Sequence, residues 1–219
     1  MTVVGRLVDA SNATLLCEIQ EGENPVSVIY KPIAGERVLW DFPDGELAKR
    51  EVAAFQVSEA LGYKIVPETI LRDGPYGLGS VQRWVDVDES IDVLSLASTD
   101  DLRIRKMALF DVIINNTDRK YGHILPDLEG AIFGCDHGVA FHHEDKLRTV
   151  LWQFAGESLT DQEQADLSAL MDNLEDVSIR EYLSDKDFEA LHMRIDRLAQ
   201  EGTFPFPSED WPAVPWPPF

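Results

Sequence analysis

Three side chains that could bind a metal ion and a phosphate lie close together in the middle of the sequence. Asp118 and His123 belong to the polar stretch NNTDRKYGHIL, and Asp136 follows in GCDHGVAF. Carboxylates and an imidazole can ligate a divalent cation, and a nearby Asp can orient a hydroxyl for phosphoryl transfer. Lys120 could contact the transferred phosphate or an acidic acceptor. The pattern indicates metal-assisted chemistry on a phosphate.

A lysine and a glutamate upstream could complete such a site. Lys31 ends the apolar run SVIYKP, and Glu51 lies in the middle of DGELAKREVAAFQVSEALG. In phosphoryl-transfer enzymes, a strand lysine contacts the α- and β-phosphates and pairs with a helix glutamate. Lys31 is the only lysine in the expected N-terminal strands, so we expect it to pair with Glu51.

Each of these residues also has a structural interpretation. Asp118 could be a turn residue, because Asp hydrogen-bonds readily to nearby backbone. His123 could be a hydrogen-bonded core histidine, and CDHG could be a plain hairpin turn. Lys31 could protect the edge of a sheet from aggregation. The joint occurrence of these residues favours the functional interpretation.

The first part of the chain is expected to be rich in strands. Apolar, β-branched runs at 14–20 and 26–32 flank the turn EGENP, and two more strands are expected around RDGPYG. Between these pairs, residues 44–62 have the pattern of a helix that ends at Gly62. We therefore expect a β-rich N-terminal lobe, residues 1–85, that contains one helix.

The remainder is expected to be mostly helical. DLRIRKMALFDVIINN predicts a helix directly before the polar stretch, AIFGCDHG a short strand, and residues 161–202 further helices. We assign residues 86–203 to a C-terminal lobe. Residues 204–219 are rich in proline and aromatic residues, which predicts an extended tail packed on the body. The fold class is thus α+β with two lobes, and the polar stretch lies near their boundary.

The composition is strongly acidic. The chain of 219 residues has 40 acidic and 19 basic residues, giving a net charge of −21. This charge argues against nucleic acid and anionic membrane partners, which require clustered Lys and Arg; it favours solubility, or a basic protein partner. There is no apolar run long enough for a transmembrane helix and no signal peptide pattern. Cys17 and Cys135 are expected as buried thiols. We expect a cytoplasmic monomer.

The motifs resemble a known superfamily. Protein kinases carry H-R-D-x-x-x-x-N followed by D-F-G, and DRKYGHIL…GCDHGVAF resembles the corresponding core of phosphatidylinositol 3- and 4-kinases and their atypical relatives, including HipA-type and Fam20 kinases. YKPIAGERVLWDFPDGELAKREVAAF and KLRTVLWQFAGE resemble, more narrowly, an actinobacterial phosphatidylinositol 3- and 4-kinase-like family. The resemblance covers about residues 5–200 and implies a two-lobed atypical kinase fold.

The resemblance implies a role for each motif residue. Lys31 would bind the nucleotide phosphates, Glu51 would orient Lys31, Asp118 would be the catalytic Asp, and Asp136 would ligate Mg²⁺ or Mn²⁺. The stretch QRWV would form the interlobe strand whose backbone contacts the adenine of ATP; its members are Gln82, Arg83, Trp84 and Val85.

The chain also departs from the kinase pattern. His123 stands where the second metal ligand is usually Asn, and an imidazole favours softer metals than an amide oxygen. No G-x-G-x-x-G motif is present, so Ser11 and Asn12 of DASNAT are the candidates for a phosphate-binding nest.

Several functional alternatives stay open from the sequence. An ATP-binding pseudokinase scaffold is favoured by His123, whereas the presence of both Asp118 and Asp136 argues for an active enzyme. A metal hydrolase could use five residues, although they lack a tight ligand motif: His123, Asp136, His137, His142 and His143. For a kinase, we expect a protein hydroxyl, the chain itself or a small polyol as acceptor ahead of a lipid in a bilayer. Transfer of AMP instead of phosphate is a further alternative.

Overall fold

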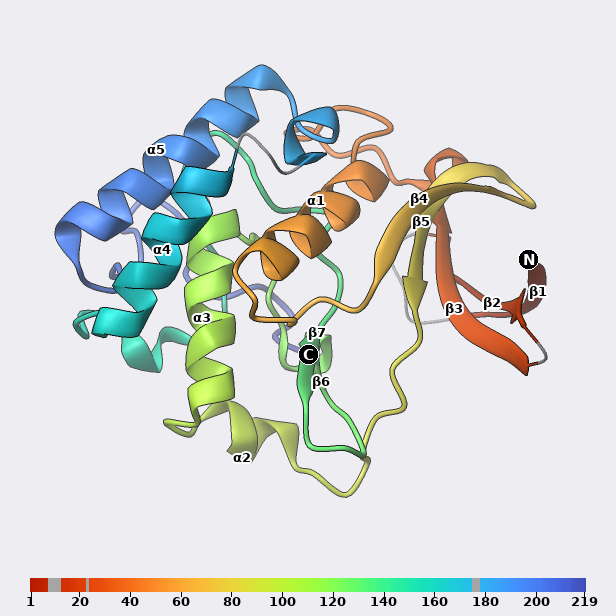
Figure 1. The fold of residues 1–219 in the computed structure, drawn as a ribbon, viewed down its shortest axis with the longest axis horizontal. Helices are drawn as coiled ribbons and strands as arrows, with labels where there is room; N and C mark the ends of the chain where they lie inside the picture. Colours follow the sequence, from red (N-terminus) through yellow and green to blue (C-terminus); the bar gives the residue numbers. More distant parts are fainter. Residues whose placement is uncertain (8–12, 23, 175–177) are drawn as a thin grey trace.

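The computed structural model describes residues 1–7, 13–22, 24–174 and 178–219. A twisted sheet lies at one end of the molecule and a group of helices at the other, with helix α1 between them (Figure 1). Both the antiparallel N-terminal sheet and the mostly helical remainder agree with the sequence analysis, so the α+β class is confirmed.

The N-terminal sheet has the strand order β1-β2-β3-β5-β4, and all neighbours are antiparallel. Its strands are β1 Thr2–Arg6, β2 Leu15–Glu21, β3 Asn24–Pro32, β4 Thr69–Gly74 and β5 Gly77–Arg83. Alternation along the strands places Cys17, Val28, Tyr30 and Val81 in a small core on one face. Lys31 is one residue beyond Tyr30 and therefore belongs to the opposite face, which α1 partly covers.

Helix α1, Leu47–Ala60, joins the sheet to the main core. Ala53, Ala54 and Val57 are completely buried, because small side chains allow this helix to pack closely on its neighbours. The helix begins where the carboxylate of Glu36 accepts hydrogen bonds from the backbone N–H groups of Leu47 and Ala48. These contacts satisfy donors that the first turn of a helix leaves free, and they fix the position of α1.

Helix α3, Leu102–Ile114, is the centre of the C-terminal part. Almost every side chain of α3 is buried, which explains its nearly continuous apolar sequence. The elements around it are α2 Val93–Ala97, α4 Asp161–Asn173 and α5 Asp185–Glu201, with short 3₁₀ turns η1 Ile33–Gly35, η2 Tyr121–His123, η3 Trp152–Phe154 and η4 Ser178–Glu181. A hairpin of β6 Ile124–Pro126 and β7 Ile132–Gly134 follows the polar stretch; the sequence indicated β7 but not β6. Among the helices in the described ranges, none combines the length and hydropathy needed to cross a bilayer.

The C-terminal segment runs over the body after Phe204, which is buried. The carbonyl of Ala213 accepts hydrogen bonds from the Thr149 N–H and the Trp152 indole. The carbonyl of Pro218 accepts one from the Tyr121 N–H, and the ring of Phe219 lies 5.8 Å from that of Tyr121. The C-terminus therefore lies against the polar stretch, beside the β6–β7 hairpin (Figure 1).

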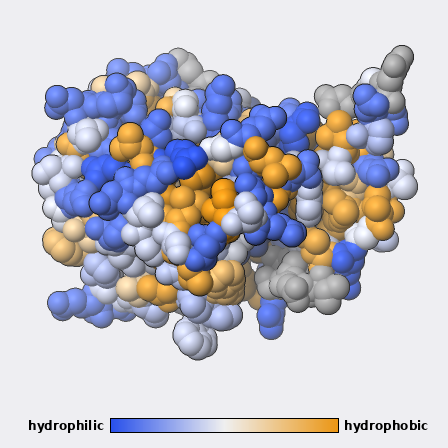
Figure 2. Space-filling view, turned by 90° about the horizontal axis from the view of Figure 1, so that it is seen from below, coloured by the Kyte–Doolittle hydropathy of each residue, from blue (hydrophilic) through white to orange (hydrophobic). Residues whose placement is uncertain are grey.

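The molecular surface reflects the acidic composition. Hydrophilic residues dominate the face in Figure 2, and hydrophobic residues gather in its middle and at the end formed by the sheet. Val4, Ile70 and Leu78 are exposed hydrophobic residues of this sheet.

Candidate active site

Lys31, Glu51 and Asp136 meet although they are far apart in the sequence. The Lys31 ammonium lies 2.5 Å from Glu51 Oε1 and also contacts the carboxylate of Asp136. Burial would lower the pKa of Lys31, but the charges of Asp136 and Glu51 outweigh it and raise that pKa. In turn, the Lys31 charge lowers the pKa of Asp136. Lys31 and Asp136 are therefore both charged at neutral pH.

The backbone around this triad holds its members in place. Lys31 lies opposite Ser80 in the ladder between β3 and β5. A Cβ at the neighbouring Gly79 would lie 2.3 Å from the carbonyl oxygen of Lys31, so only glycine allows the two strands to approach this closely. Glu51 also accepts a hydrogen bond from the backbone N–H of His137 at 3.0 Å, which links α1 to the residue after Asp136.

Asp136 itself has an unusual backbone conformation. It is the second residue after β7 and has a φ of 59°, in the left-handed region that non-glycine residues rarely occupy. This conformation turns the chain sharply at the end of the strand. The turn brings the Asp136 carboxylate to Lys31, and the N–H of the next residue to Glu51.

The two amides of the polar stretch have structural tasks. Asn115 ends α3 with a φ of 51°, and its side chain donates to the carbonyls of His142 and Glu144. Asn116 donates to Asp111 and accepts from the backbone N–H of Asp118 at 3.1 Å. The amides therefore replace regular backbone pairing at the end of the helix, and they fix the loop that carries Asp118.

Arg119 is a fully buried cation that the sequence analysis did not identify. Its guanidinium pairs with Asp111 of α3, which is also fully buried, at 2.9 Å. It donates further hydrogen bonds to the carbonyls of His123 and Cys135, and its Nη2 lies 2.7 Å from His137 Nε2. Arg119 thus ties α3, the polar stretch and the end of β7 together. The available sequence clue was Asp111, a single carboxylate inside an otherwise apolar helix.

His137 provides a prediction about pH. Burial and the charge of Arg119 hold the pKa of His137 well below its usual value, so the folded state keeps it neutral. The unfolded chain binds that proton near pH 6.5. The unfolding free energy should therefore fall as the pH is lowered from about 7 to 5, by up to about 1.4 kcal/mol per pH unit for this group. Denaturant titrations at several pH values should show a shallower slope for His137→Gln; an unchanged slope would contradict the assignment.

His123 lies beside Asp136 in a position that suits a metal ligand. The distance from His123 Nε2 to Asp136 Oδ2 is 3.4 Å, which allows both atoms to contact one cation at about 2.0–2.2 Å. Burial lowers the pKa of His123, although the charge of Asp136 opposes this effect. His123 Nδ1 is buried without a hydrogen-bond partner in the described part of the chain. The chemistry of this pair fits Mn²⁺ or Mg²⁺.

Asp118 and Lys120 complete the group of predicted residues. The Lys120 ammonium lies 3.4 Å from Asp118 Oδ2, and both side chains are partly exposed. Asp118 lines the same cavity as Lys31, Glu51 and Asp136, and this cavity has a volume of about 340 Å³. Such a volume is within the range of small-molecule sites. Residues 36–37 and 39–42, Arg148 and Trp211 form other parts of its wall.

The predicted adenine-binding strand requires a correction. Strand β5 ends at Arg83, so Trp84 and Val85 lie beyond it. The backbone N–H groups of Arg83 and Trp84 donate to the backbone carbonyls of Glu68 and Ser27, respectively, so they already have partners. Gln82 belongs to the Lys31 face of the sheet and donates to Thr69. Residues 83–85 line a second cavity of about 670 Å³ together with Phe133. Ser11 and Asn12 lie outside the described residues.

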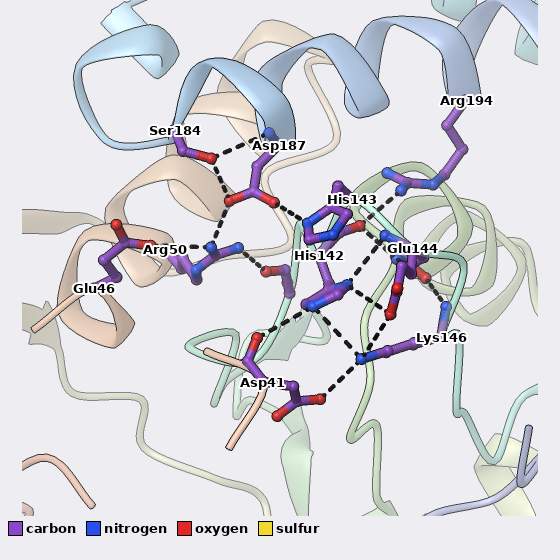
Figure 3. Close-up of polar contacts among 12 residues, drawn as sticks. Asp41, Glu46, Arg50, His142, His143, Glu144, Lys146, Ser184, Asp187 and Arg194 are labelled. Atoms are coloured by element: carbon purple, nitrogen blue, oxygen red, sulfur yellow. Dashed lines mark hydrogen bonds and ion pairs between the residues drawn. The ribbon is translucent and has the colours of Figure 1, made fainter. Parts of the chain in front are cut away.

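His142 and His143 form a separate cluster with Glu144, in which the possible ligand atoms lie within 4.8 Å of one another but have other partners (Figure 3). His142 Nδ1 accepts from the Glu144 N–H, and its Nε2 faces the Asp41 carbonyl at 3.1 Å. The Lys146 ammonium contacts Glu144 and Asp41, each at 3.1 Å, and therefore occupies the place of a cation. His143 lies 3.3 Å from Asp187 instead. This arrangement argues against the metal hydrolase alternative for these residues.

The fold matches solved structures of atypical kinases, and no known family model matches the sequence. A hydra Fam20 structure with sugar aligns with a TM-score of 0.60 and 14% identity, covering 92% of this chain and 84% of that one. The Golgi casein kinase with Mn/ADP bound gives a TM-score of 0.54 and 13% identity, covering 91% and 72%. The Helicobacter pylori proinflammatory kinase CtkA gives 0.51 and 12%, covering 91% of each chain.

A sequence relative is much closer. Protein Rv2133c of Mycobacterium tuberculosis is 40% identical over an alignment that covers 100% of this chain and 92% of the relative. Identity at this level over the whole length indicates common descent. The chain therefore belongs to the same protein family as Rv2133c and has the fold of atypical kinases.

Proposed function

We propose that this chain is an ATP- and divalent-metal-dependent phosphotransferase whose acceptor is a hydroxyl group, of the phosphatidylinositol 3- and 4-kinase-like superfamily. The observation that carries the proposal is the contact of Lys31 with both Glu51 and Asp136, in a cavity that Asp118 also lines. A strand lysine, a helix glutamate, a loop aspartate and a strand-terminal aspartate are the parts that kinase chemistry requires. The atypical kinase fold supports the proposal.

Each side chain has a proposed task. Lys31 contacts the α- and β-phosphates, and Glu51 keeps its ammonium pointing into the cavity. Asp136 and His123 hold the metal ion, which when bound neutralises charge on the phosphates. Asp118 orients the acceptor hydroxyl and accepts its proton. The hydroxyl oxygen forms a bond to the γ-phosphorus, and the bond between that phosphorus and the oxygen that bridges to the β-phosphate breaks. Lys120 stays within reach of the transferred group, because it lies beside Asp118.

For the adenine of ATP we propose the end of β5. Gln82 belongs to the same sheet face as Lys31, and Ile29, directly opposite it in the ladder, is the half-buried apolar residue available to cover a base. Because the N–H groups of Arg83 and Trp84 already have partners, backbone contacts to adenine would fall mainly on Val85. Ser11 and Asn12 remain proposed contacts of the phosphates.

A binding experiment tests this function. We expect Mn·ADP to bind, and we expect EDTA to weaken ADP binding at least tenfold, because the phosphates and Asp136 repel each other without a cation between them. Asp136→Asn should give a similar loss. The matched control is Asp73→Asn, which removes one charge from an exposed position on β4. Calorimetry that shows equal ADP affinity with and without EDTA would refute the proposal.

The acceptor is proposed to be a protein hydroxyl, the chain itself or a small polyol ahead of a bilayer lipid. A net charge of −21 opposes approach to an anionic membrane. The test supplies γ-labelled ATP to phosphatidylinositol vesicles and protein acceptors side by side. Label that enters only the vesicles, and that is lost in Asp118→Ala, would identify a lipid kinase instead. ATP binding without turnover would identify a pseudokinase, and mass spectrometry of the product distinguishes transfer of phosphate from transfer of AMP.

A further inference from the structure

Arg148 is a cation of the active-site cavity that has no task in the proposed transfer. It is half-buried and lines the cavity with Asp118 and Asp136. Its Nε donates to the carbonyl of Thr117 at 2.6 Å. Its two terminal nitrogens make no hydrogen bond or ion pair with any residue in the described ranges. In a chain with 40 acidic and 19 basic residues, a half-buried guanidinium without a carboxylate partner is unexpected.

The backbone holds Arg148 firmly beside the catalytic loop. Its N–H donates to the carbonyl of Asn116, and its carbonyl accepts from the N–H of Arg119. Together with the Nε contact to Thr117, these bonds flank Asp118 on both sides in the sequence. The Arg148 guanidinium is therefore fixed relative to Asp118, the residue that the proposed function places at the acceptor hydroxyl.

An aromatic ring further restricts the orientation of this guanidinium. Arg148 Cζ lies 5.7 Å from the centre of the Trp211 ring, within the range of a cation–π contact. Nε is occupied by Thr117, so the two terminal nitrogens form the free edge of the group. Two parallel N–H donors on this edge match the geometry of a carboxylate or phosphate.

The carboxylates of the cavity do not compete for this edge, because each has another partner. Asp136 and Glu51 contact Lys31, and Asp118 contacts Lys120. Asp41 pairs with Lys146 at 3.1 Å, and Glu36 accepts from two N–H groups at the start of α1. Lys31 and Arg37 line the same cavity. Lys31 is already paired with two carboxylates and is assigned to the nucleotide phosphates, so an oxyanion of the acceptor would make its paired contacts with Arg148.

We propose that Arg148 is the specificity-determining residue of an acceptor subsite, and that the acceptor carries an oxyanion, a phosphate or a carboxylate, in addition to its hydroxyl. The role of the bound anion as an acceptor rests on the proposed function, but its binding at Arg148 does not depend on nucleotide. An anionic group held by Arg148 would orient the rest of the acceptor relative to Asp118.

The experiment uses three related probes on the intact protein without nucleotide: glycerol, glycerate and glycerol 3-phosphate, titrated at constant ionic strength with tryptophan fluorescence or calorimetry as the measurement. We expect glycerol not to bind and at least one of the two anions to bind. Binding of glycerate alone or of glycerol 3-phosphate alone identifies which oxyanion the subsite takes. Arg148→Gln should weaken anion binding about tenfold or more, and Arg148→Lys should weaken it less.

Controls separate this subsite from the nucleotide site. Arg72→Gln removes the same charge from an exposed position on β4 and should leave anion binding unchanged. The affinity for Mn·ADP should be the same in the wild type and in Arg148→Gln. Equal anion affinity in these two proteins, or a loss of Mn·ADP affinity in Arg148→Gln, would overturn the proposal. If Mn·ADP fails to bind the wild type while the anion result holds, the proposed function fails and the oxyanion subsite remains.

Discussion

Asp118→Asn is expected to lower the rate of phosphoryl transfer by about 10²–10⁴-fold, the usual contribution of a positioned general base. The amide has nearly the same shape but cannot accept the hydroxyl proton. Since the Asp118 side chain is partly exposed and its ion pair among the described residues is with Lys120, the fold should not change. The measurement is the single-turnover rate with labelled ATP, together with the affinity for Mn·ADP, which should stay within about twofold because Asp118 is not a proposed metal ligand.

Two comparisons make this result specific. Asp73→Asn carries the same chemical change on β4 and should keep the full rate. Lys120→Gln removes the partner of Asp118 and should have a smaller effect, because the carboxylate remains. If Asp118→Asn retained the wild-type rate, Asp118 would not be the base, and the proposed arrangement of the acceptor would be wrong.

Arg119→Leu is expected to have the largest effect on stability, about 3–5 kcal/mol, because it leaves the carboxylate of Asp111 buried without its counter-charge. For a chain of this size, the change corresponds to a fall of roughly 6–20 °C in Tm. Asp111 is completely inaccessible to water, so no solvent can replace the lost partner. Thermal and denaturant unfolding both measure the effect.

A double variant distinguishes the lost charge pair from lost packing. Replacing Asp111 by Leu together with Arg119 by Met removes both charges, and it should recover a large part of the stability. The recovery will be incomplete, because Arg119 also donates to the carbonyls of His123 and Cys135. A single Arg119→Leu variant whose stability falls by less than about 1 kcal/mol would show that water enters the core at this point.

The sequence was sufficient for the fold class and for choosing residues that the structure brings together. Alternating strands and an amphipathic helix follow from local patterns, and these patterns placed Lys31 near a strand end and Glu51 in mid-helix. The structure joins both residues to Asp136, which is 105 residues from Lys31. Their roles in chemistry stay predictions.

Other features could not be found in this way, because they depend on tertiary contacts. The left-handed backbone of Asp136 is fixed by the bonds of its neighbours rather than by its own preference. The importance of Arg148 depends on tertiary contacts in which nearby carboxylates have other partners. The end of β5 at Arg83 could not be found from QRWV, because its strand-like pattern continues to Val85.

The contact between Lys31 and Asp136 also bears on the supply of metal in the cell. In the empty cavity an ammonium already neutralises the carboxylate that is proposed to hold the metal. A lone cation would have to displace this ammonium and leave it with Glu51 alone, whereas a cation that arrives with a nucleotide brings phosphates to which Lys31 can move. Under the proposed function, the protein would not withdraw manganese or magnesium from the cell when nucleotide is scarce, and it would compete for metal only as its nucleotide complex.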